Sequence, residues 1–60
     1  MTEHFQTYRN GWSVMMDKSG YLWTVLARDA RGEVYDKVRC DTYRDAMDYW
    51  NAFRAIAKAA

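Results

Sequence analysis

The chain has 60 residues, a formal net charge of +1 and one cysteine, Cys40. A chain of this length forms a single domain with a small core, and one cysteine excludes an intrachain disulfide. Together with the single histidine, His4, that cysteine cannot supply the four ligands of a structural zinc site. No apolar run approaches the ~20 residues of a membrane span, and no secretion leader is recognisable. A lone thiol also fits a reducing compartment, so we expect a cytoplasmic protein.

Turn signals divide the first two thirds of the chain into strands. The motif Asp-x-x-Gly occurs at 17–20 and at 29–32, and each copy is typical of a three-residue hairpin loop with a left-handed glycine. These turns predict antiparallel strands over about 12–17, 21–29 and 33–40. The Asn10-Gly11 pair is typical of a two-residue hairpin and leaves room for a fourth strand through residues 4–9.

From Thr42 onward the apolar residues recur with a helical period. One stripe holds Ala46, Tyr49, Trp50, Phe53, Ile56, Ala57 and Ala60, which predicts a helix over about 42–59. Thr42 or Asp41 is the expected N-cap, and Asp45 follows as in a capping box. The predicted fold class is therefore α+β: a three- or four-stranded antiparallel meander with one C-terminal helix packed on one face, in one domain of residues 1–60.

One helix can cover only one face of this sheet. If both hairpin loops have three residues, residues of equal parity share a face. The more aliphatic, even-numbered face, with Leu22, Leu26, Val38 and Cys40, is assigned to the helix, and the odd-numbered face is left uncovered. Exposed aromatic and basic surface is typical of an interaction site. The residues predicted to bind a partner are Trp23, Tyr35 and Arg39, surrounded by Tyr21, Lys37 and Met15. The alternatives are that neighbouring side chains cover these rings, or that Trp23 belongs to the core.

The sequence carries no recognisable catalytic signature. It has no Gly-rich phosphate loop, Cys40 falls on the face assigned to the core, and Asp41, Asp45 and Asp48 are explained as caps and helix-start charges. We therefore predict no catalytic residue, no metal site, no cofactor and no small-molecule substrate.

A non-enzymatic protein-binding module is the first functional hypothesis. High aromatic content and a net charge near zero favour a protein partner or a second copy of the chain as a homodimer. The small size is typical of a regulator or inhibitor of the phage type, for example of a host defence. The alternative is a nucleic-acid interface. In it Tyr21, Trp23 and Tyr35 form a stacking platform for bases, and the neighbouring cations Arg28, Lys37 and Arg39 contact phosphates.

The segments "WTVLARDARGEV" and "CDTYRDAMDYW" resemble the DNA-binding domains of tyrosine integrase N-termini and of plant ethylene-response factors. The shared features are a strand that ends in Arg28-Asp29 and a helix that starts with Thr42 and reaches Ala46. The resemblance covers roughly residues 12–50 and implies a three-stranded sheet that lies in the major groove of DNA. It implicates Arg28, Lys37 and Arg39, although Thr24 and Leu26 stand where those families carry arginines. It also places Trp23, Val25 and Ala27 against the helix, opposite to the parity prediction.

Overall fold

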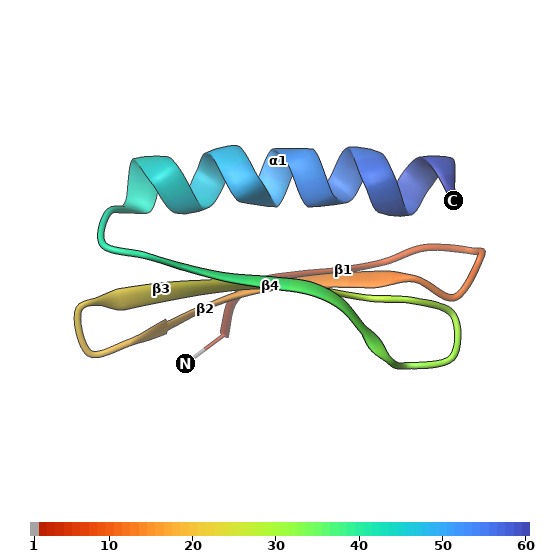
Figure 1. The fold of residues 1–60 in the computed structure, drawn as a ribbon, viewed down its shortest axis with the longest axis horizontal. Coiled ribbons are helices and arrows are strands. Elements are labelled where there is room, and N and C mark those ends of the chain that lie inside the picture. Colours follow the sequence, from red (N-terminus) through yellow and green to blue (C-terminus); the bar gives the residue numbers. More distant parts are fainter. Residues whose placement is uncertain (1) are drawn as a thin grey trace.

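The computed structural model describes the backbone of residues 2–60 and the side chains of residues 4–60. Its elements are β1 (Thr2–Thr7), β2 (Ser13–Ser19), β3 (Leu22–Arg28), β4 (Val34–Cys40) and α1 (Tyr43–Ala59). The strands form one antiparallel sheet in the order β1-β2-β3-β4, and α1 lies across one face of it (Figure 1). The predicted α+β fold is confirmed, and the fourth strand is present at the N-terminal edge.

The β1–β2 turn differs from the two-residue loop that Asn10-Gly11 predicted. Tyr8 and Trp12 close a three-residue loop: the Tyr8 N–H donates to the Trp12 carbonyl at 2.9 Å, and the Gly11 N–H donates to the Tyr8 carbonyl at 3.0 Å. The Asn10 side chain explains the difference. Its Oδ1 accepts from the Trp12 N–H at 2.9 Å, and its Nδ2 donates to the Ala57 carbonyl at 2.8 Å. Asn10 therefore ties this turn to the last turn of the helix.

The β2–β3 turn also differs from its prediction. Ser19 pairs with Leu22, so the loop contains only Gly20 and Tyr21 instead of three residues. Gly20 has a φ of 63° and no other type of residue in the described chain has a positive φ, which is the pattern of a type II′ turn. Asp17 lies within β2, opposite Thr24, and does not begin the turn.

The β3–β4 turn follows the Asp-x-x-Gly prediction. The Asp29 carbonyl accepts from the Gly32 N–H at 2.9 Å, and the Asp29 N–H donates to the Glu33 carbonyl at 2.9 Å. The carboxylate of Asp29 also accepts from the N–H groups of Arg31 at 2.9 Å and Glu33 at 3.0 Å. The aspartate thereby fixes a three-residue loop, as the sequence predicted.

A bulge follows this turn. Ala27 pairs with Asp36 but Arg28 pairs with Val34, so Tyr35 is an extra residue in β4. Because the β2–β3 loop has two residues instead of three, the odd-numbered residues of β3 lie on the face that the even-numbered residues of β2 occupy. The bulge in β4 exchanges the two faces again. On β2, and on β4 from Asp36 onward, the even-numbered residues therefore face the helix, as predicted. Val34, before the bulge, faces the opposite side, contrary to the prediction, and on β3 the odd-numbered residues face the helix. The parity prediction was wrong for β3.

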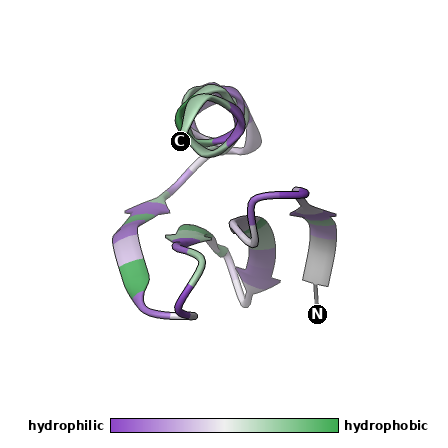
Figure 2. Cartoon of the chain, turned by 90° about the vertical axis from the view of Figure 1, so that its right-hand side faces the viewer, coloured by the Kyte–Doolittle hydropathy of each residue, from purple (hydrophilic) through white to green (hydrophobic). Residues whose placement is uncertain are grey.

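The core lies between α1 and this helix-facing side of the sheet. Its buried residues are Val14, Met16, Val25, Ala27 and Cys40 from the sheet and Ala46, Trp50, Phe53 and Ala57 from the helix. Thr42 is the N-cap, and its hydroxyl accepts from the Asp45 N–H at 3.2 Å. Figure 2 looks along the helix and shows α1 above one face of the sheet. Within residues 2–60 no element covers the other face, and the helix is neither long nor apolar enough to cross a membrane.

Candidate binding face

The sheet surface that points away from α1 is called the open face. Directly paired residues of an antiparallel sheet point to the same side, so the register defines this face in rows across the strands. The rows are Phe5–Met15–Leu26–Lys37, Asp17–Thr24–Arg39 and Thr7–Ser13–Arg28–Val34, with Ser19–Leu22 at the end next to the β2–β3 turn. The open face is therefore a mixed surface, apolar over β1–β3 and basic over β3–β4.

The apolar part centres on Leu26. This side chain is only 7% exposed although it points away from the helix and does not belong to the helix-side core. Its neighbours in the row are Met15 and Lys37, whose flexible side chains can lie along an apolar surface. Phe5, at the end of the row, is 62% exposed. The open face thus has a shallow apolar strip that ends in an exposed ring.

Three cations border this strip. Arg28, Lys37 and Arg39 are all exposed and lie on the two adjacent strands β3 and β4. Nη1 of Arg28 donates to the Gly32 carbonyl at 2.9 Å, so the β3–β4 turn orients its guanidinium. Asp17 is the acidic residue that the register places on the same face. The three residues predicted from the DNA alternative therefore lie together on the uncovered side of the sheet.

Trp23 does not lie on the open face, contrary to the parity prediction. It pairs with Cys40 and packs against the core, and its ring meets the Tyr43 ring edge-on with centroids 5.0 Å apart. The Lys18 ammonium lies 5.3 Å from the centre of the same ring. The physical reason is the two-residue turn, which rotates β3 so that Trp23 faces the helix, as the family resemblance implied.

The remaining predicted partner-binding residues are divided over three places. Met15, Lys37 and Arg39 share the open face. Tyr35 is the bulge residue, and the centre of its ring lies 5.1 Å from the centre of the Trp12 ring. Tyr21 is 79% exposed in the β2–β3 turn. The six residues therefore do not form one patch.

The open face also contains residues that the parity argument missed. The parity prediction places Leu22, Thr24 and Leu26 on the helix side, but the observed register places them on the open side. Phe5 pairs with Met15 and also lies on this face. The alternation in "HFQT" indicates a strand but favours the buried side for its one apolar residue, so it does not predict the exposed ring. The stated alternative, with Trp23 in the core, gives the observed face of β3, since the odd-numbered residues of this strand pack against the helix.

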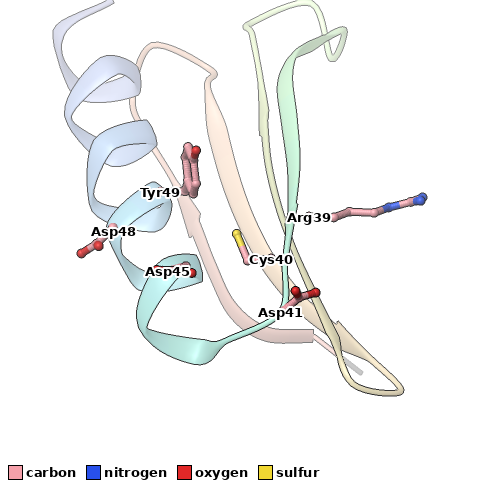
Figure 3. Close-up of a pocket in the computed structure, with 6 residues that line it drawn as sticks. All are labelled: Arg39, Cys40, Asp41, Asp45, Asp48 and Tyr49. Carbon is pink, nitrogen blue, oxygen red and sulfur yellow. The ribbon is translucent and has the colours of Figure 1, made fainter.

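A shallow depression of about 510 Å³ lies between β4 and the start of α1 (Figure 3). It is lined by Arg39, Cys40, Asp41, Asp45, Asp48 and Tyr49, but the Arg39 side chain extends away from Cys40. Burial raises the pKa of the Cys40 thiol, and the negative charges of Asp45 and Asp41 raise it further. The thiol is therefore held in its protonated, weakly nucleophilic form. Among the described residues no group of acidic, His and Cys side chains is arranged to hold a metal ion.

Comparison of the chain with protein-family models, with curated proteins and with solved structures finds no match.

Proposed function

We propose that this chain is a non-enzymatic binding module that contacts duplex DNA through its open face. The observation that carries the proposal is the position of Arg28, Lys37 and Arg39, which project from two neighbouring strands on the side that α1 leaves uncovered. Arginine and lysine on an exposed surface are the side chains that neutralise phosphates and donate to guanine.

The dimensions of the sheet fit this partner. β3 and β4 are the last two strands of the four-stranded sheet. Neighbouring strands lie about 4.8 Å apart, so this end of the sheet is narrow enough to approach the ~12 Å major groove of B-DNA. Lys37 and Arg39 are two residues apart on β4 and point to the same side, as suits contacts to successive backbone groups. Thr24 lies between Arg39 and β2, where its methyl group can contact thymine.

Arg28 has a different role in this proposal. One of its N–H groups is engaged by the Gly32 carbonyl, which restricts the rotation of the side chain. The other donors of the planar guanidinium remain available for bidentate contacts. Arg28 is therefore the residue expected to read a base edge, with Lys37 and Arg39 on phosphates.

A protein partner is the second candidate function, and a specific observation favours it. Phe5 is an exposed aromatic ring, and Met15 and Leu22 extend the apolar part of the same face. Together with a net charge of only +1, such a surface suits a protein with an acidic rim around an apolar patch, or a second copy of this chain. In that case the chain acts as a small regulator or inhibitor of the partner.

Two double variants test the first candidate. Lys37→Gln/Arg39→Gln and Arg9→Gln/Arg44→Gln each remove two positive charges, but Arg9 lies in the β1–β2 turn and Arg44 on the helix. Fluorescence anisotropy with a labelled random duplex at low salt should show a ~10-fold or larger loss of affinity for the first variant and less than ~3-fold for the second.

Equal losses in both variants would mean that only net charge matters, and would refute a binding role for the open face. For the second candidate the test is Phe5→Ser. If the open face binds DNA, Phe5→Ser should keep the DNA affinity of the parent chain. If the open face binds a protein, Phe5→Ser should lose self-association in sedimentation, or lose binding to its protein partner.

A further inference from the structure

A second groove lies on the other side of the sheet, between the edge strand β1 and the helix. Its volume is about 450 Å³, and it is lined by Gln6, Tyr8, Asn51, Arg54, Ala55 and Lys58. Gln6 and Tyr8 are two residues apart on and just after β1, and Arg54 and Lys58 stand one helical turn apart. The groove is therefore built jointly by the first strand and the second half of α1.

The polar side chains of this groove share one property: each can donate a hydrogen bond. Arg54 and Lys58 are donors only, and the amides of Gln6 and Asn51 and the Tyr8 hydroxyl donate as well as accept. None of the six lining residues is acidic. A site with two cations, further donors and no carboxylate is complementary to an oxyanion.

Two features hold this site in place. The Arg54 guanidinium lies 5.7 Å from the centre of the Trp50 ring, and His4 packs edge-on against the same ring at 5.2 Å. Trp50 is buried, so it anchors the arginine to the core. The restricted guanidinium loses less freedom when it binds, which favours a preorganised site over a flexible surface charge.

The Tyr8 hydroxyl is an independent indication of a missing partner. Tyr8 packs against the core, and its hydroxyl oxygen is buried with no hydrogen-bond partner in the part of the chain that the structure describes. A buried polar group of this kind is unfavourable unless something accepts its hydrogen bond. Tyr8 lines the groove, so a small rotation of its side chain would bring this hydroxyl within reach of an oxygen of a bound anion, which would supply that acceptor.

We propose that the groove formed by Tyr8, Asn51, Arg54 and Lys58 binds a phosphate group. It lies on the helix side of the sheet, so it is separate from the open face and does not depend on the DNA proposal. The ligand can be inorganic phosphate or the phosphate group of a larger molecule, because both present the same charged oxygens to the groove.

The test is a titration of the ¹⁵N-labelled chain with inorganic phosphate, followed by amide chemical shifts at constant ionic strength. Saturable shifts confined to the groove residues, with a dissociation constant of about 1–10 mM, are expected. A parallel titration with a phosphorylated nucleoside tests whether the phosphate belongs to a larger molecule. A second one with acetate tests whether the groove prefers phosphate to a carboxylate. A tighter response to the nucleoside phosphate would favour a phosphorylated ligand, and a tighter response to phosphate would favour the free ion. An equal response to acetate would overturn the proposal.

Variants separate the site from general charge effects. Arg54→Gln/Lys58→Gln should weaken phosphate binding about tenfold, and Tyr8→Phe about threefold, whereas Arg44→Gln, on the same helix but outside the groove, should change it less than ~2-fold. Arg54 and Lys58 are exposed, so these variants should fold, which circular dichroism checks. Tyr8→Phe should leave the urea midpoint unchanged or raise it, because it removes the unpaired hydroxyl. Unchanged phosphate affinity in the double variant would overturn the proposal.

Discussion

Replacing Trp23 with alanine tests the register on which the open face depends. Trp23 is half-buried, packs against the core and contacts the Tyr43 ring at 5.0 Å. A buried aromatic side chain covers 150–250 Å², so half of this area at ~25 cal/mol per Å² gives about 2–3 kcal/mol, and the ring contact adds ~0.5–1.5 kcal/mol. The expected loss is about 3 kcal/mol of unfolding free energy.

This loss is large for so small a chain. At ~0.05–0.15 kcal/mol per residue, a domain of this size has a total stability of about 3–9 kcal/mol. Trp23→Ala should therefore retain only about 0–6 kcal/mol, and at the lower end of this range about half of the molecules are unfolded at 25 °C. Urea unfolding followed by far-ultraviolet circular dichroism measures the change, since tryptophan fluorescence is itself altered by the substitution. The matched control is Leu22→Ala, which removes a half-buried neighbour from the open face and should cost only about 1 kcal/mol.

Two results would refute the reasoning. The first is a Trp23→Ala variant with the stability of the parent chain. The second is a Leu22→Ala variant as destabilised as Trp23→Ala. Either result would mean that the odd-numbered residues of β3 do not face the helix, and the open face would have to be reassigned.

Three further predictions concern the turns and the thiol. Asn10→Ala removes the hydrogen bond that joins the first turn to the Ala57 carbonyl and the one that the Trp12 N–H donates within the turn. It should therefore cost about 1–2 kcal/mol and lower the melting temperature by roughly 5–15 °C in calorimetry. Gly11→Ala should destabilise more than Gly20→Ala in urea, because both have positive φ but only at Gly11 would the new Cβ lie 3.1 Å from another side chain; equal losses would contradict this. Because the folded chain favours the protonated Cys40 thiol, its stability is complete below the thiol's ordinary pKa and falls as the pH rises through the higher folded pKa. Thiolate absorbance should accordingly appear at lower pH in urea than in buffer.

Local chemistry was sufficient to predict the helix and one turn. Thr42 caps the helix through the Asp45 N–H, and Asp29 folds its loop with its own carboxylate, so both signals are satisfied within a few residues. Such short-range hydrogen bonds depend little on the rest of the fold. The predicted strand ranges 12–17, 21–29 and 33–40 agree with the ends of β2, β3 and β4 to within two residues.

The register could not be predicted in the same way. Two-residue and three-residue loops differ little in local free energy, and the choice at Gly20 is made by how Trp23 and Val25 pack under the helix. The bulge at Tyr35 then restores the parity of β4. The two changes of parity therefore left β2 and β4 beyond the bulge as predicted and turned β3 and Val34, which moved Trp23 into the core and Leu26 to the open face.

The salt dependence of DNA binding tests the central claim most directly. If Lys37 and Arg39 each neutralise a phosphate, the logarithm of the binding constant should fall with the logarithm of salt concentration with a slope of about −1.8. Lys37→Gln/Arg39→Gln should bring that slope close to zero, and Arg9→Gln/Arg44→Gln should leave it near −1.8. The absence of binding at low salt, or the same slope in both variants, would contradict the assignment of the open face as a DNA-binding surface.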